Sequence, residues 1–449
     1  MKRYPAYKDS GIEWLGEVPE EWEVSYLKNI GRFSASGIDK KIVEGESLVR
    51  MVNYMDIYGN DTKLIDNERE LMTVSCPEWK IAECNLIKGD LVFTPSSETS
   101  EDIGLSALIT ENLTNAVYSY HVVRFRFKKV FNHNFKRYIC NNTFVLQQFT
   151  KASRGTTRQI LDRSDFKNIT VVIPPFEEQK RIANFLDRKT TKIDELIKKN
   201  ETLVELLKEK RQAVISHAVT KGLDPNAKMK DSGIEWIREI PEKWEVRKLK
   251  HLTTEKFKNG IFKKKEFYGS GIKLINVFDV YRQDFYIEIE SLDRIEVTSQ
   301  EIQTYSVKAG DIVFVRSSLK LEGVGASACV PSLSEPLLFE CHLVKLQPSS
   351  KILPEYLINF LNSSIVRQRL IALANTVTMA TLGQSTLTSI EVELPPVFEQ
   401  QAILIYLISE TTKIDELINN ILSQIAALKE YRQALISNVV TGKVRVDEN

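Results

Sequence analysis

The sequence predicts an α+β protein in which two β-rich heads are joined by two long antiparallel helices, with the halves related by an internal pseudo-two-fold repeat. Three observations support this prediction. The 449-residue chain repeats itself at an offset of about 220 residues. Each copy ends in a long stretch with apolar residues every three or four positions, which is typical of a helix that packs on another helix. The middle of each copy holds short alternating or β-branched runs, which predict strands.

The repeat is established by segments that return in the same order. KDSGIEW occupies residues 8–14 and 230–236, and TTKIDELI occupies residues 190–197 and 411–418. The middle parts share only a skeleton, in which a GD[LI]VF run is followed by two serines. Two similar frameworks therefore carry two different heads. We expect an opening segment (1–24), a first head (25–172), a first long helix (173–222), a linker and second opening segment (223–246), a second head (247–393), a second long helix (394–442) and a tail (443–449).

The opening segments contain four of the five tryptophans. Because large aromatic side chains bury much apolar area, we expect these four to anchor the core: Trp14, Trp22, Trp236 and Trp244. Within the heads, VRFRF at 123–127 alternates apolar and basic residues, as a half-buried strand does. Short helices are expected around 134–149 and 354–371.

The long helices are expected at 176–220 and 397–441. A Pro-Pro pair precedes each one, where a missing N–H costs little, and a glycine follows each end. Asn200 lies on the apolar seam where the copy has Ile421, and it is either buried there or at a solvated edge. The seam residues form one list for each helix: Ile182, Leu186, Ile193, Leu196, Leu203, Leu207 and Val214, then Ile403, Leu407, Ile414, Leu417, Ile421, Leu428 and Leu435.

Several classes of protein are excluded by missing motifs. No P-loop, GxSxG or HExxH sequence is present. IPPF at 173–176 resembles a methyltransferase motif, but Ile173 and its copy Leu394 cannot accept a hydrogen bond from a base. The five cysteines form no CxxC pair, so we expect no metal site and a reducing, cytoplasmic location. No apolar stretch is long enough to predict a membrane span.

The net charge of +1 hides local asymmetry. Residues 112–161 contain nine basic residues and no acid, and residues 243–265 contain nine basic residues and two acids. Such windows, interleaved with aromatic residues, are typical of a phosphate-binding face, although a solvated face balanced by distant acids would look the same. The candidate phosphate contacts are Arg124, Arg126, Lys128, Lys129, Lys263, Lys264 and Lys265.

Residues 153–159 (SRGTTRQ) are the sharpest candidate for reading bases. Arg154 and Arg158 could form bidentate hydrogen bonds with guanine, and Gln159 could do so with adenine. Thr156 and Thr157 could contact phosphate or a thymine methyl group. The matching segment of the second copy has different side chains, so it would read different bases. The remaining candidates are the serine pairs with their neighbours and two threonines of the second copy: Ser96, Ser97, Arg316, Ser317, Ser318, Lys320, Thr378 and Thr381.

The doubled motifs resemble the specificity subunit of type I restriction–modification systems. The residues that carry this resemblance are KDSGIEW with PEEWEV, KGDLVF followed by SS, IPPFEEQKRIANFLD and TTKIDELI. Each is present in both copies, either unchanged or in a similar form, and together they cover essentially the whole chain. The resemblance implies that each head recognises one half of a split DNA site and that the helices form the spacer. It also implies a scaffold without catalytic activity or bound cofactor, which holds two modification subunits that use S-adenosylmethionine. Restriction subunits that use ATP and Mg would join for cleavage.

The repeated eight-residue segment TTKIDELI, which we call the octamer, keeps its charged residues as well as its apolar ones. Packing of a helix seam needs only the apolar residues, so identical outward charges predict the docking of two copies of one partner. The predicted partner-binding residues are Lys192, Asp194, Glu195, Lys413, Asp415 and Glu416.

Two other functions stay open at this point. A free-standing bivalent DNA-binding regulator would need no enzyme partner, and the repeated helix charges argue against it. A self-contained DNA methyltransferase would need a glycine-rich cofactor loop, which the sequence does not show.

Overall fold

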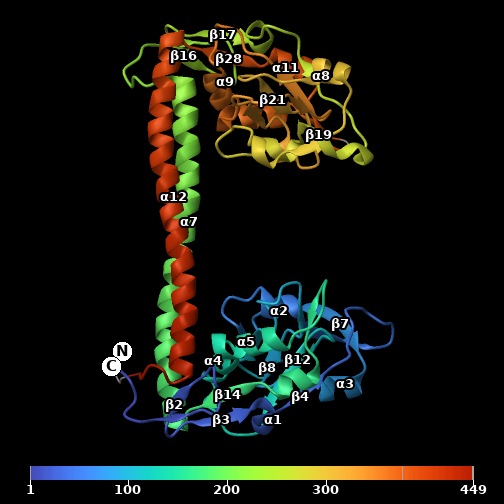
Figure 1. Cartoon of the computed structure of the whole chain (residues 1–449), viewed down its shortest axis with the longest axis vertical. Helices are drawn as coiled ribbons and strands as arrows, with labels where there is room; N and C mark the ends of the chain where they lie inside the picture. Colours follow the sequence, from blue (N-terminus) through green and yellow to red (C-terminus); the bar gives the residue numbers. More distant parts are fainter. Residues whose placement is uncertain (1, 377, 447–449) are drawn as a thin grey trace. The chain divides into compact units, whose positions relative to one another are not determined.

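The computed structural model describes residues 2–376 and 378–446. The chain forms two compact units, one made of Met1–Asn200 with Ser423–Asn449 and the other of Glu201–Leu422. Each unit therefore combines one head with the first part of one long helix and the last part of the other. This mixed helix and sheet architecture confirms the predicted fold class (Figure 1).

The first unit begins with paired strands and builds its head on a five-stranded sheet, in the order β4-β12-β8-β10-β6, and a three-stranded sheet, in the order β11-β5-β7. Strands β12 and β8 are antiparallel neighbours in the larger sheet. The elements are β1 (Tyr7–Asp9), β2 (Glu17–Pro19), β3 (Glu23–Tyr26), α1 (Leu27–Ile30), β4 (Gly31–Ala35), β5 (Ser47–Val52), α2 (Tyr54–Tyr58), β6 (Leu64–Ile65), β7 (Met72–Cys76), α3 (Glu78–Glu83), β8 (Leu91–Phe93), β9 (Ser96–Ser97), β10 (Ser106–Ile109), β11 (Ala116–Tyr118), β12 (Val123–Phe127), α4 (Lys136–Cys140), α5 (Thr143–Ala152), β13 (Gln159–Ile160), α6 (Arg163–Lys167), β14 (Thr170–Ile173) and α7 (Phe176–Lys221).

The second unit repeats this plan with a four-stranded sheet, in the order β18-β25-β21-β23, and a three-stranded sheet, in the order β20-β19-β24. The elements are β15 (Met229–Asp231), β16 (Glu239–Pro241), β17 (Glu245–Lys248), η1 (Leu249–His251), β18 (Lys258–Asn259), η2 (Lys265–Phe267), β19 (Tyr268–Ile275), η3 (Val277–Val280), η4 (Ile289–Ser291), β20 (Asp293–Ile295), α8 (Ser299–Tyr305), β21 (Ile312–Val315), β22 (Ser317–Ser318), η5 (Leu321–Gly323), β23 (Ser327–Cys329), β24 (Leu337–Phe339), β25 (Leu343–Leu346), α9 (Pro354–Leu361), α10 (Ser364–Ala372), β26 (Asn375–Thr376), β27 (Ala380–Thr381), α11 (Gln384–Ser389), β28 (Glu391–Leu394) and α12 (Val397–Val440).

The long helices begin and end where the sequence predicted. Helix α7 has 46 residues and α12 has 44 residues, and each starts directly after its Pro-Pro pair. Gly222 and Gly442 follow the ends with φ of 77° and 74°, the left-handed conformation that favours glycine. A Cβ on Gly442 would lie 2.3 Å from Pro19 Cδ, so this helix end packs tightly on the opening segment.

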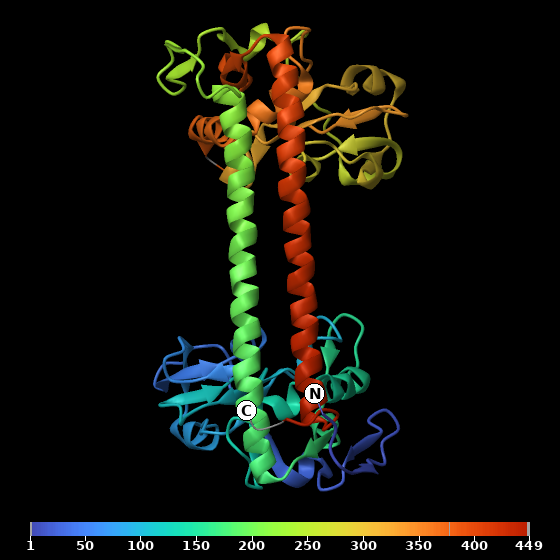
Figure 2. The same ribbon diagram turned by 90° about the vertical axis from the view of Figure 1, so that its left-hand side faces the viewer.

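Within each unit the two helix segments run antiparallel. In the first unit, Arg432 of α12 donates to Asp194 of α7 at 2.7 Å, and the residues after α12 reach the start of the unit, where Arg445 N donates to Lys2 O. In the second unit, Arg211 of α7 donates to Asp415 of α12 at 2.9 Å. Figure 2 shows the helix segments side by side in both units.

The predicted seam is confirmed at most of its positions along both helices, including Leu207, Ile421 and Leu435, and is wrong at three leucines. Ile197 and Val204 are buried in place of Leu196 and Leu203. Residues three and four positions after a seam residue both lie near the seam, and here the fourth position is the one that is buried. Asn200 is half-buried at the edge of the seam. The leucines predicted to be buried but found exposed are Leu196 (45%), Leu203 (43%) and Leu417 (46%).

Each head is fastened to a helix by a repeated set of hydrogen bonds. In the first unit, Thr143 N donates to Ser437 Oγ at 2.7 Å, and Gln433 Nε2 donates to Asn141 O. The second unit makes the same bonds, from Ser364 N to Ser216 Oγ at 2.9 Å and from Gln212 Nε2 to Asn362 O. The predicted short helices are each broken in two at this point, into α4 and α5 and into α9 and α10.

The tryptophan prediction holds for two of the four residues. Trp22 and Trp244 are fully buried, at 2% and 0% exposure. Trp14 is 46% exposed, so its predicted core position is wrong, and Trp236 is only half-buried. The Trp14 ring instead packs against the Phe144 ring, and their centroids are 4.6 Å apart. Among the described residues, no helix is both long and apolar enough to cross a membrane.

Candidate nucleic-acid interface

Each head forms a short strand from its serine pair, and this strand pairs with a second segment from later in the head. In the first head, β9 pairs with β13, so that Gln159 faces Ser97. In the second head, β22 pairs with β27, so that Ser317 faces Thr381. The structure therefore brings the predicted serines together with the predicted base-reading segments. We call these two places the reading edges, formed by residues 96–97 with 153–160 and by residues 317–320 with 378–381.

The first reading edge contains a closed hairpin. Arg154 N donates to Ile160 O at 3.1 Å, and Ile160 N donates back to Arg154 O at 2.9 Å. Gly155 has φ of 133°, and a Cβ there would lie 2.0 Å from the carbonyl oxygen of Arg158. No larger residue fits this position without moving the backbone. The sequence folds locally into a hairpin because the glycine permits this close approach.

The hairpin exposes some of the predicted side chains and uses others internally. Thr156, Thr157 and Arg158 are exposed. Arg154 is also exposed but forms an ion pair with Asp165 at 2.8 Å. The amide of Gln159 closes the hairpin, since Nε2 donates to the carbonyl oxygen of Gly155 at 2.7 Å.

The four predicted serines lie beneath the surface. Ser96, Ser97, Ser317 and Ser318 are each between 3% and 8% exposed. Ser97 Oγ accepts from Thr99 N at 3.3 Å, and Ser318 Oγ accepts from Lys320 N at 3.2 Å. These hydroxyl groups shape the loop that follows each strand, and short hydroxyl side chains suit this role because they replace backbone partners in tight turns.

The second reading edge differs in its side chains. Lys320 and Thr378 are exposed, and Thr381 is half-buried with its hydroxyl group 3.4 Å from Ser317 Oγ. Arg316 is half-buried, and its Nε has no hydrogen-bond partner within the described part of the chain. The two edges thus share a backbone arrangement and present different groups to the outside.

Two of the predicted basic residues, Arg124 and Arg126, lie on β12 in the five-stranded sheet of the first head. Arg126 donates to Asp90 at 2.8 and 2.7 Å, and this hydrogen bond raises the pKa of its guanidinium group. Arg124 is 8% exposed and donates to the carbonyl oxygens of Glu83 and Asn85. Both arginines line a cleft of about 380 Å³ that also includes Lys128.

The remaining predicted lysines differ in their exposure to solvent and in whether they form ion pairs. Lys128 is exposed, whereas Lys129 is exposed but forms an ion pair with Glu23 at 2.9 Å. Lys263 is mostly buried and pairs with Glu301 at 2.9 Å. Lys264 and Lys265 are exposed.

The repeated GD run has a structural role in both heads. Asp90 Oδ2 accepts from Ile87 N at 3.0 Å, and Asp311 Oδ2 accepts from Lys308 N at 2.8 Å. Each carboxylate also lies beside a basic residue of the neighbouring strand, Arg126 in the first head and Lys345 at 3.5 Å in the second. The aspartate therefore fixes a turn and compensates a buried cation.

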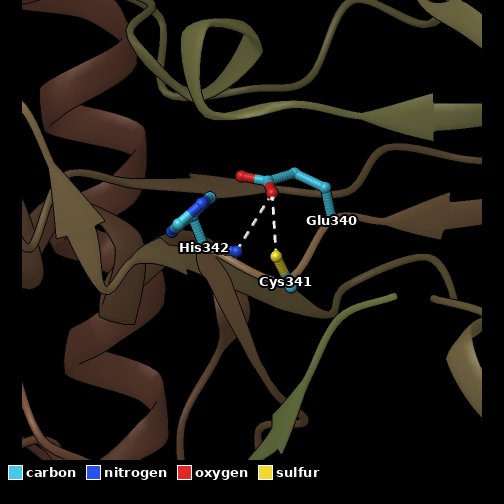
Figure 3. Close-up of side chains that lie close together, drawn as sticks. All are labelled: Glu340, Cys341 and His342. Atoms are coloured by element: carbon cyan, nitrogen blue, oxygen red, sulfur yellow. Dashed lines mark hydrogen bonds between the residues drawn. The ribbon is translucent and has the colours of Figure 1, made fainter. Parts of the chain in front are cut away.

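Beside the second reading edge, Glu340, Cys341 and His342 form a compact group (Figure 3). Glu340 Oε2 accepts from His342 N at 3.0 Å and from Cys341 Sγ at 3.6 Å. Burial and the Glu340 charge raise the pKa of the Cys341 thiol, which favours the neutral thiol over the thiolate that binds metal best. These hydrogen bonds account for the group as part of the turn between β24 and β25.

The repeated octamers place their charges in two ways. Asp194 and Asp415 form ion pairs with arginines of the facing helix, Arg432 and Arg211. Lys192, Glu195, Lys413 and Glu416 are exposed, and Lys413 is hydrogen-bonded to Glu410 on the same helix. The exposed leucines Leu196 and Leu417 lie beside these charges.

One repeated feature was missed in the sequence. NYMDIY at residues 53–58 returns as NVFDVY at residues 276–281. Asn53 N donates to Asp56 at 2.8 Å, and Asn276 N donates to Asp279 at 2.7 Å, so both copies start with the same capping box. The N-x-x-D-[IV]-Y match at nearly the same offset as the other repeats was the signal that could have found it.

The comparisons with known proteins agree with one another. A family model described as "Type I restriction modification DNA specificity domain" matches residues 19–206 and 241–427. The MjaVIII specificity subunit of Methanocaldococcus jannaschii is 27% identical over 69% of this chain and 70% of its own length. The putative MjaX specificity subunit of the same organism is 24% identical over 96% of both chains.

Two solved structures share the fold. A chain from the structural study of complex assembly and conformational transition of the type I R-M system matches with a TM-score of 0.70 and 16% identity, over 95% of this chain and 99% of that one. The HsdS subunit from Thermoanaerobacter tengcongensis matches with a TM-score of 0.50 and 16% identity, over 95% and 98%.

Proposed function

The chain belongs to the type I restriction–modification DNA specificity family, and from this premise we propose that each of its reading edges contacts one half of a split DNA site. Specificity subunits are the non-catalytic DNA-recognition subunits of these systems, so the chain recognises DNA and does not itself catalyse a reaction. Two matched domains fit a site with two halves.

The observation that carries this proposal is the pair of reading edges. Both are built from a serine strand held against a second strand, and both expose polar and basic side chains. Because the backbone arrangement is shared and the side chains differ, each edge offers a different pattern of donors and acceptors to base edges. Different half-sites follow from this difference.

Within the edges, the exposed side chains are the ones that we propose as contacts. Arg158, Thr156 and Thr157 serve the first half-site, and Lys320 and Thr378 serve the second. Arg154 can join them if DNA competes with Asp165 for its guanidinium group. The buried serines, Gln159, Arg124 and Arg126 support the frame, and Lys128, Lys264 and Lys265 are free to contact phosphates.

We further propose that the repeated octamers dock two modification subunits. Glu195 with Leu196 and Glu416 with Leu417 form matching exposed pairs, each with an apolar centre beside a charge. Such a pair suits the same partner surface twice. The modification subunits would bring S-adenosylmethionine, restriction subunits would bring ATP and Mg, and the complex would act on DNA in the cytoplasm.

A head exchange tests the proposal. Residues 247–390 are replaced by the second head of a related chain with the same skeleton, and the chimera is expressed with the modification subunits in cells that lack the native chain. Sequencing of methylated DNA should show that one half of the motif changes and the other half stays the same. A chimera that is folded and active but alters both halves would show that the heads do not act independently.

A further inference from the structure

The NxxD[IV]Y turn, repeated at residues 53–58 and 276–281, carries more than its structural role requires. The capping box accounts for its asparagine and aspartate, and the buried Ile57 and Val280, at 0% and 2% exposure, account for the aliphatic position. Burial raises the pKa of Asp279 to about 6, which fits a carboxyl group placed to serve the turn rather than solvent. None of these contacts explains two large side chains that occupy the third and sixth positions of both copies.

Those side chains are exposed at the same positions in both heads. Met55 and Tyr58 are 58% and 39% exposed, and Phe278 and Tyr281 are 64% and 45% exposed. Single exposed apolar residues are ordinary on a protein surface, but a pair at the same two positions of two otherwise different heads indicates a shared role.

Each tyrosine is hydrogen-bonded either to the serine strand of its head or to the loop that follows this strand. Tyr281 Oη donates to Ser318 Oγ at 3.2 Å. A Cβ on Gly323 would lie 2.4 Å from Ser318 Oγ and 2.5 Å from Tyr281 Oη, so glycine permits this close packing. In the first head, Tyr58 Oη donates to Asp102 at 3.2 Å, and the same carboxylate accepts from Thr99 at 2.9 Å.

The turn is thus continuous with the reading edge. In the second head, the edge also exposes Leu319 (84%) and Lys320, while Tyr281 lines a cleft of about 430 Å³ together with Arg211 and Arg367. Apolar groups bordered by cations suit DNA, because bases offer ring faces and thymine methyl groups while phosphates offer negative charge.

We infer that this tyrosine turn supplies the apolar base contacts of each half-site, Met55 with Tyr58 in the first and Phe278 with Tyr281 in the second. This inference rests on the proposed function, since it names contacts within the same DNA interface. The exposed residue three positions before the tyrosine is methionine in one head and phenylalanine in the other. The two turns therefore contribute different apolar contacts to the two half-sites.

The test uses the complex of the full chain with its modification subunits and duplexes that carry its methylated motif, identified from host DNA. Phe278→Ala should weaken binding about ten-fold and relax base preference in the second half-site only. Met55→Ala should do the same in the first half-site only. The ring-preserving Phe278→Tyr should keep most of the affinity.

Matched controls separate base contact from general damage. Trp79→Ala in the first head (65% exposed) and Ile365→Ala in the second (42% exposed) remove apolar side chains outside the turn and should change neither affinity nor motif. Wild-type affinity and an unchanged motif in both Phe278→Ala and Tyr281→Ala would overturn the inference. So would an equal loss in Phe278→Tyr and Phe278→Ala at unchanged melting temperature. A wild-type complex that methylates no split motif would instead overturn the proposed function.

Discussion

Glu393 gives the sharpest stability prediction because it is an acid buried in an apolar core. It lies on β28 opposite Val246 and is 2% exposed. Its Oε2 has no hydrogen-bond partner within the described residues. Burial raises the pKa of this carboxyl group to about 8, partly offset by the charge of Lys221. The corresponding residue of the first unit is Val172, which carries no charge.

The sign and size of the effect follow from the two pKa values. The unfolded chain has a glutamate pKa of about 4.3, so the folded protein holds the proton more tightly. Stability is therefore highest below that value and falls as the pH rises toward about 8. At about 1.4 kcal/mol for each pKa unit, the loss is at most about 5 kcal/mol.

Glu393→Val removes the titrating group and should abolish this loss. We expect the variant to be more stable than the wild type at pH 8 and the advantage to shrink toward pH 5, measured as melting temperature against pH. Glu245→Gln, at an exposed position of the facing strand, serves as the control and should leave the pH profile unchanged. A stability difference that stays constant from pH 5 to pH 9 would refute the reasoning.

Three further predictions concern the hairpin and the helices. Gly155→Ala should distort the first reading edge and weaken methylation through the first half-site, with the second half-site unaffected, as read by methylation sequencing. Arg211→Ala should lower the free energy of unfolding by about 1 kcal/mol in a denaturant titration, because its pair with Asp415 is only partly exposed; no change would show that the pair contributes nothing. Leu196→Glu and Leu417→Glu should each reduce co-purification of modification subunits without lowering the melting temperature, and undiminished assembly would remove the octamers from the docking surface.

Local patterns in the sequence were enough to predict the long helices. The Pro-Pro pairs and the following glycines act within one helical turn, so the ends of α7 and α12 could be read directly. The seam prediction failed at Leu196 because Leu196 and Ile197 lie three and four residues after Ile193, and this spacing alone does not decide which of the two is buried.

The candidate site was predicted only where its determinants are close in sequence. The exposed hairpin with Gly155 and Arg158 is a local structure. The cluster of basic residues around Arg126 suggested more unpaired positive charge than the structure has. Arg126 pairs with Asp90, which lies far earlier in the chain, and only the fold brings the two together. The inward direction of Gln159 likewise depends on the closed hairpin.

The central claim is that this chain selects a split DNA site for its modification subunits. The most direct measurement is sequencing of methylated bases in cells that carry the chain with those subunits, compared with cells from which its gene is deleted. We predict one motif with two separated halves, present in the first cells and absent from the second. A methylation pattern that is the same with and without the chain would contradict the account.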